Sequence, residues 1–332
     1  MRRTVLPACA AFLALMFAAC SDDDGGGGGD GGRDAGDGGD AGDGSAAADG
    51  ECPDVPQITL QDAGDEPREA VQLSPTPGDS MVLQTSISAD STHLIDGEEQ
   101  SVVDPPDMSF ALELTVEDVD DEHIATSFVF TDATPTAGSH VAMEDAIRGM
   151  AGLEGTLTTT RAGALLDVEI ADRSTLESGD GHEVPTVLSQ IDWQLTEMPI
   201  PFPEGEVGVG AEWSTFGPLD PSDTERCVEV GYTLTSRDGD TYAVEADWHR
   251  DDTTDGYSTE ATEDGADADA FEVLSETMST STVSTGRLDF PVPVSSSTEA
   301  VYASVLEVEQ DDGTRAAEEW TSRYTMGFEP PE

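Results

Sequence analysis

Runs of alternating apolar and polar residues dominate the chain from about residue 71 onward. Every second residue from Phe110 to Val116 is apolar, and Ile124, Phe128 and Phe130 continue the alternation after an Asp-rich break at 118–121. A two-residue period is typical of β-strands with one buried face. An Asp-rich break between two such runs is typical of a hairpin turn. These residues therefore predict an antiparallel hairpin.

The same pattern occurs a second time. The run from Val228 to Leu234 and the run from Tyr242 to Trp248 each lie 118 residues after their counterparts, and the turn between them at 237–240 has the same length as the first turn. Short Gly-x-Leu segments follow both hairpins, at 155–157 and 286–288. We interpret this as a duplicated β domain over 71–330, with halves of about 71–198 and 199–330. The alternative is that any two antiparallel hairpins look alike. A third hairpin is predicted between 301–305 and 320–328.

Two short helices interrupt the strands. Ser139 can cap a helix over about 140–150, and Pro185 suits the first turn of another, which Pro199 ends. The expected fold class is mainly β (α+β). We expect curved antiparallel sheets from two related halves, with the two helices packed on them.

The first 50 residues have a different composition. Arg2 and Arg3 precede an apolar stretch that ends in small residues before Cys20, which is the layout of a lipoprotein signal peptide over 1–19. Cys20 is then the lipidated N-terminus that anchors the chain in a membrane. The alternative is an ordinary signal peptide that leaves Cys20 as a plain thiol. Residues 20–50 form the anchor and a disordered Gly/Asp tether, and 51–70 form a polar lead-in.

The charge is strongly negative. The formal net charge is −58 and the pI is about 4.1. Such a chain repels nucleic acid and anionic lipid headgroups, so neither is an expected partner. Strong self-repulsion also suggests that the protein works in a salty environment that screens its charges.

Two further cysteines remain after the anchor. In an oxidising compartment two such thiols usually pair, so we expect a Cys52–Cys227 disulfide that joins the end of the tether to the domain. Two free structural thiols are the alternative.

One segment carries a family resemblance. A Pro-rich link at 201–203 leads into Val207, Val209, Gly210 and Trp213, a V-x-V-G-x-x-W pattern that resembles a family of uncharacterised bacterial lipoproteins. That family is in turn remotely similar in layout to the LolA-like lipoprotein carriers. The resemblance implies curved antiparallel sheets. It carries over no catalytic residue, because the family has none established.

No recognisable catalytic or metal-binding motif occurs. The five histidines are scattered, and the chain has no H-E-x-x-H, G-x-S-x-G or C-x-x-C pattern, so we expect no metal, no cofactor and no enzymatic activity. The four tryptophans and several other aromatic residues fill either an ordinary core or a pocket for an acyl chain. For the pocket we expect contacts from Phe128, Val187, Ile191 and Trp213.

The sequence thus predicts a lipid-anchored lipoprotein of the cell envelope that binds a hydrophobic ligand. Ser21 after the anchor favours the outer membrane over the inner one. Expected partners are the membrane, through the anchor, and a hydrophobic ligand or an envelope protein. Two alternatives stay open: a surface-displayed structural or protein-interaction module, and a hydrolase of unrecognised type.

Overall fold

The computed structural model describes residues 52–53, 55–102, 107–135, 141–171, 191, 194–220, 223–252, 257–258, 271–309 and 314–331. The signal peptide, Cys20, the tether and Val187 lie outside these residues. Among the described residues no helix is long and apolar enough to span a membrane.

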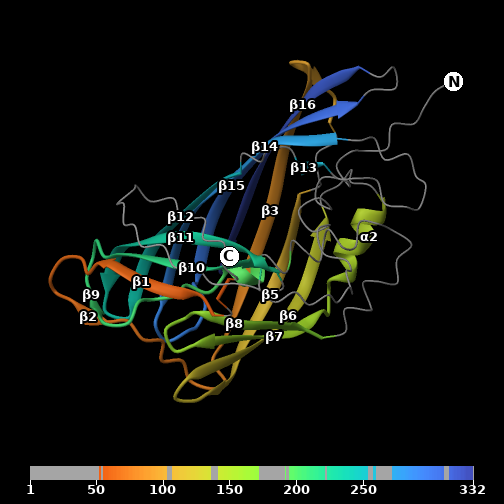
Figure 1. Cartoon of the computed structure of the whole chain (residues 1–332). Helices are drawn as coiled ribbons and strands as arrows, with labels where there is room; N and C mark the ends of the chain where they lie inside the picture. Colours follow the sequence, from red (N-terminus) through yellow and green to blue (C-terminus); the bar gives the residue numbers. More distant parts are fainter. Residues whose placement is uncertain are drawn as a thin grey trace, which may run out of the picture.

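Antiparallel strands make up most of the structure, and they join into one large curved sheet (Figure 1). The strand order is β1-β10-β11-β12-β14-β15-β16-β3-β5-β6-β7-β8, with β13 paired to β14 and β4 to β3. A separate small sheet joins β2 to β9. The strand bounds are β1 Gln57–Asp62, β2 Glu69–Ala70, β3 Ser80–Ile95, β4 Glu98–Gln100, β5 Met108–Val119, β6 His123–Pro135, β7 Glu154–Thr160, β8 Leu165–Ile170, β9 Glu206–Val207, β10 Glu212–Asp220, β11 Asp223–Asp238, β12 Thr241–Asp252, β13 Tyr257–Ser258, β14 Phe271–Arg287, β15 Ser295–Glu309 and β16 Arg315–Glu329.

The fold class expected from the sequence is confirmed. Helix α2 spans Val141–Gly149 and packs on β6, and residues 191 and 194–197 belong to a second short helix. The proposed caps of both helices lie outside the described residues. Both halves belong to the same sheet, because β16 at the end of the chain pairs with β3 near its start. The duplication itself stays a prediction.

The two predicted hairpins form as β5–β6 and β11–β12. The turn of the first lies at 120–122, where Asp120 Oδ1 accepts hydrogen bonds from the backbone N–H groups of Glu122 and His123. These bonds hold the pKa of the Asp120 carboxyl below its usual value. The second turn contains Gly239 with a φ of 58°, a left-handed conformation that glycine adopts without strain.

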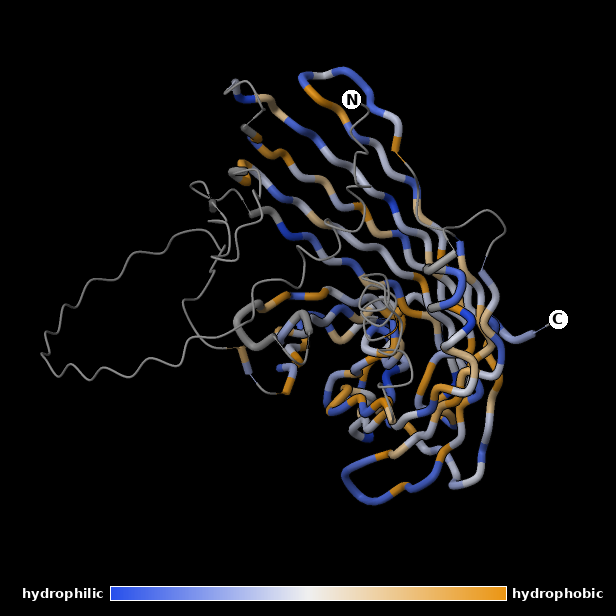
Figure 2. The backbone as a smooth tube through the Cα atoms, turned by 90° about the vertical axis from the view of Figure 1, so that its right-hand side faces the viewer, coloured by the Kyte–Doolittle hydropathy of each residue, from blue (hydrophilic) through white to orange (hydrophobic). Residues whose placement is uncertain are grey.

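One face of the sheet encloses the core. Core side chains come from both halves of the chain, Phe110 and Phe130 from the first and Tyr242 and Phe328 from the second. Ile147 of α2 is also fully buried in this core. The residues between them on each strand point to the opposite face, as the pleat requires. The core cluster fills the inner face only at one end of the long strands. Figure 2 shows these strands extending beyond the part of the molecule that encloses the core cluster.

Candidate functional site

A second set of buried apolar side chains lies on the same face as the core but outside the core cluster. Its strands are β12, β14, β15, β16 and β3, at the end of these strands away from the core. We call this surface the aromatic face. Its buried apolar members are Ala89, Trp248, Ala300, Tyr302, Leu306, Ala316 and Trp320.

The strand register brings these residues into rows. Trp248 lies opposite Thr280, which lies opposite Ala300, and Ala300 lies opposite Tyr324. The next rows contain Tyr302, and then Trp320 beside His93. Neighbouring strands are about 4.8 Å apart and the rise per residue is about 3.4 Å, so the face measures roughly 19 Å from β12 to β3 and about 27 Å along β16.

His93, Trp320 and Glu318 form a cluster between strands β3 and β16 at one side of the aromatic face. The imidazole of His93 on β3 stacks on the indole of Trp320 on β16, with ring centroids 3.8 Å apart and an interplanar angle of 13°. His93 Nε2 lies 3.1 Å from Glu318 Oε2, and both side chains are largely buried. The imidazole therefore has a flat aromatic contact and a carboxylate partner at the same time.

Tyrosine hydroxyls and serines add polarity to the aromatic face. Burial raises the pKa of Tyr302, and the negative charge of Glu276 raises it further, so the phenol stays neutral at physiological pH. Ser322 lies opposite Tyr302 and donates to or accepts from Ser91 Oγ at 3.0 Å. The face is thus apolar with isolated hydrogen-bonding groups, which is the usual lining of a small-molecule site.

Two buried side-chain atoms on the aromatic face, Trp248 Nε1 and Ser304 Oγ, have no hydrogen-bond partner among the described residues. Trp248 is 5% exposed, and its Nε1 has no hydrogen-bond acceptor within the part of the chain that the structure describes. The core indole of Trp213 differs, because its Nε1 donates to the carbonyl oxygen of Pro201 at 2.8 Å.

The site residues predicted from sequence lie elsewhere. Phe128, Ile191 and Trp213 are 1%, 2% and 0% exposed and belong to the core cluster. Trp213 stacks on Tyr232 with ring centroids 5.5 Å apart. Their burial favours the core alternative over the pocket alternative. The structure therefore brings three of the four predicted ligand contacts together as core, and the fourth, Val187, lies outside the described residues.

Sequence reasoning grouped Trp248 and Trp320 with the other tryptophans and did not separate the aromatic face from the core, although a signal was present. The core-facing positions of β5 are apolar without exception from Met108 to Val116. On β14, β15 and β16 the core-facing positions include Thr280, Ser284, Ser304 and Ser322. Hydroxyl groups at successive inward positions indicate a face that is not wholly part of a core.

Cys52 and Cys227 form a disulfide, with Cα atoms 5.5 Å apart across 175 residues of sequence. Cys227 lies on β11 opposite Pro218 of β10, so the bond ties the start of the described chain to the β10–β11 hairpin. The strand β1 that follows Cys52 pairs with β10 of the same hairpin.

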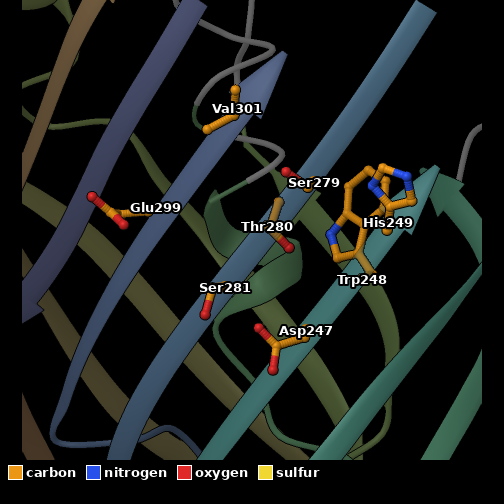
Figure 3. A pocket seen from close by; sticks show the side chains of 8 residues that line it. All are labelled: Asp247, Trp248, His249, Ser279, Thr280, Ser281, Glu299 and Val301. Carbon is orange, nitrogen blue, oxygen red and sulfur yellow. The ribbon is translucent and has the colours of Figure 1, made fainter. Parts of the chain in front are cut away.

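A groove lies across β12, β14 and β15 (Figure 3). Its volume is about 490 Å³. Most of its lining residues occupy strand positions that alternate with those of the aromatic face, so their side chains point away from the core. The lining residues are Asp247, Trp248, His249, Ser279, Thr280, Ser281, Glu299 and Val301. Asp247, Ser281 and Glu299 lie opposite one another in one row.

The described residues contain no group of three or more His, Cys, Asp or Glu side chains arranged to hold a metal ion. The carboxylates of the groove lie in a row rather than converging on one point.

Comparison with known proteins identifies no family. No family model and no curated protein matches the chain. Among solved structures, it has a weak likeness to the InvG secretin domain β-barrel from the Salmonella SPI-1 injectisome NC-base, at 13% identity and a TM-score of 0.13. That likeness covers 80% of this chain and 63% of the secretin chain. A TM-score this low carries no inference about fold or function, and the lipoprotein resemblance stays a prediction.

Proposed function

We propose that this chain is a non-enzymatic, lipid-anchored protein of the cell envelope that binds a hydrophobic ligand on its aromatic face. One observation carries the proposal: a set of buried aromatic and aliphatic side chains continues the inner face of the sheet beyond the core cluster. A set of apolar side chains with a few hydrogen-bonding groups among them is suited to contact with an acyl chain or a similar ligand.

The size of this surface supports a ligand rather than a single side-chain contact. The aromatic face crosses five strands, from Trp248 on β12 to His93 on β3. Apolar surface contributes about 25 cal/mol per Å² when it is removed from water, so a chain lying along several of these rings gains several kcal/mol. Binding by such a surface needs no catalytic group, and the sequence offers no recognisable one.

The proposed location rests on the N-terminal sequence. A signal peptide over 1–19 and a lipidated Cys20 tether the domain to a membrane, and Ser21 after the anchor favours the outer membrane. The Gly/Asp tether and the net charge of −58 favour a domain held away from an anionic bilayer. A ligand then has to leave the membrane to reach the aromatic face.

The test is native mass spectrometry of the chain from Ser21 onward, which keeps every described residue and removes the lipid anchor. We expect a fraction of the protein to carry an added mass that organic extraction identifies as a lipid. Ala300→Asp, which puts a charge in the aromatic face, should remove that mass. Val301→Asp, one residue along on the opposite face, is the matched control and should keep it. Purely unliganded wild-type protein after addition of envelope lipids argues against the proposal.

A second candidate is a protein-interaction module. It is favoured by the groove across β12, β14 and β15, whose carboxylates Asp247 and Glu299 suit a basic segment of a partner. A photocrosslinking amino acid at Ser281 should then yield one discrete protein adduct in intact cells, and the same group at Thr282 should not. Absence of an adduct from both positions removes this candidate.

A further inference from the structure

The unpaired indole N–H of Trp248 indicates which chemical group the ligand must carry. Its N–H group is buried and meets no acceptor in the described part of the chain. Buried donors in native proteins almost always have a partner, which is protein, ordered water or a bound molecule. Indole has one donor and no acceptor, so only an acceptor atom can satisfy Trp248.

The buried indoles of Trp248 and Trp213 differ in this respect. The Nε1 atom of Trp213 is also fully buried, and a backbone carbonyl oxygen at 2.8 Å accepts its hydrogen bond. In the core, the indole N–H of Trp213 is therefore paired with an acceptor of the chain itself. Trp248 lies beyond the core cluster, in the aromatic face where the ligand is proposed to bind.

The surroundings of Trp248 favour an uncharged acceptor. The residues that follow it across the sheet are Thr280, Ala300 and Tyr324, none of which is ionised at neutral pH. The charged residues at inward positions further along the strands are Arg250, Glu276 and Glu318, so negative charge predominates there. A carboxylate or phosphate would meet this field and the overall net charge of −58.

We propose that Trp248 Nε1 donates a hydrogen bond to the carbonyl oxygen of a neutral acyl ester, whose hydrocarbon chain lies across the aromatic face toward Trp320. The ester carbonyl is an acceptor without a charge, and the chain matches the apolar rows beside Trp248. This inference rests on the proposed function and specifies the ligand of the same site.

A peptide fits this face less well than an acyl ester. Each residue of a bound peptide brings a backbone N–H and C=O that need partners once they are buried. The strands of the aromatic face from β14 to β16 are paired on both sides, so their backbone groups are already used. An acyl ester brings one strong acceptor, its carbonyl oxygen, which a single indole N–H can satisfy.

The experiment compares two ligands that differ in the carbonyl alone, using the chain from Ser21 onward. 1-Monopalmitoylglycerol carries the ester, and 1-O-hexadecylglycerol has the same chain and hydroxyls with an ether in its place. One neutral hydrogen bond should make the ester bind about 5- to 10-fold more tightly to the wild type. Trp248→Phe keeps an aromatic ring without the N–H and should bind both ligands with equal affinity. Trp320→Phe is the matched control and should keep the preference for the ester.

A second measurement does not depend on a variant being folded. The indole ¹H–¹⁵N signal of Trp248 should shift downfield when wild-type protein binds the ester, and less when it binds the ether. Equal affinities and equal shifts for the two ligands overturn the inference, because the acceptor of the indole N–H is then an ordered water and not the ester. This result leaves the proposed function intact. Tighter binding of palmitate than of the ester also overturns it. If neither neutral ligand nor palmitate binds, the proposed function itself fails.

Discussion

His93 stacks face to face on Trp320 across the β3–β16 pair, with ring centroids 3.8 Å apart. This pair joins residues from the two ends of the described chain and lies at the seam where the predicted halves meet. Stacked aromatic pairs contribute about 0.5–1.5 kcal/mol beyond the area they bury.

We therefore expect His93→Ala and Trp320→Ala to be non-additive. Trp320→Ala should lower the free energy of unfolding by about 3–5 kcal/mol and His93→Ala by about 1 kcal/mol. The coupling between them should be about 0.5–1.5 kcal/mol in a double-mutant cycle from urea denaturation. His249→Ala, an exposed histidine of β12, should change stability by less than about 0.5 kcal/mol. Strict additivity of the first two substitutions would mean that the stacking contributes nothing.

The disulfide between Cys52 and Cys227 should be a major source of stability. It closes a loop across 175 residues, and the loss of entropy of the unfolded chain corresponds to about 3–5 kcal/mol for a loop of this size. Cys52→Ser, Cys227→Ser and the double variant should lose the same amount, because each removes the same bond. Urea denaturation of the wild type with and without reductant measures it directly. If reductant leaves the midpoint unchanged, the bond does not constrain the fold.

Two strand glycines should be intolerant of even one added carbon. A Cβ at Gly286 would lie 2.2 Å from Tyr242 Cζ, and a Cβ at Gly155 would lie 2.4 Å from Phe128 Cζ. Both rings are buried, so neither can move away freely. Gly286→Ala and Gly155→Ala should each destabilise the protein by about 1–3 kcal/mol.

The matched control for these glycines is Gly231 on β11, where the nearest atom to an added Cβ is 3.6 Å away. Gly231→Ala should be neutral or stabilise the protein by about 0.5–1 kcal/mol, because alanine loses less conformational entropy on folding. Thermal melts of the three variants distinguish the cases. Similar melting temperatures for all three would refute the close packing of the two rings.

Salt should stabilise this protein strongly. The net charge is −58, and like charges on a compact domain repel one another unless ions screen them. The free energy of unfolding in urea should rise between 0.05 and 1 M NaCl, and it should rise similarly with KCl because the effect is screening. A flat salt dependence contradicts this account of the acidic composition.

The alternating pattern predicted the strands and their buried faces because side-chain direction is a local property of a strand. Phe110, Leu114 and Phe128 are buried as their alternation required. It could not predict that Trp320 pairs with His93, because that pairing joins distant parts of the chain and depends on where the long connections run. The helices were recognisable from local periodicity for the same reason that the strands were.

The candidate site was harder to predict because alternation identifies a face and not what lies on it. Trp213 and Trp248 occupy similar alternating runs, yet one is in the core and the other lies beyond it. The difference depends on which part of the curved sheet the remaining chain covers. Only the serines and threonines at inward positions of β14, β15 and β16 carried that information in the sequence.

The most direct test of the central claim is to locate a bound acyl chain. A palmitoyl ester with a diazirine near the end of its chain should crosslink, on irradiation, to peptides of β15, β16 and β3 that contain Tyr302, Trp320 and His93. An excess of unlabelled ester should abolish the labelling. Labelling of Phe128 or Trp213 peptides instead, or labelling of all surfaces without competition, would contradict a ligand site on the aromatic face.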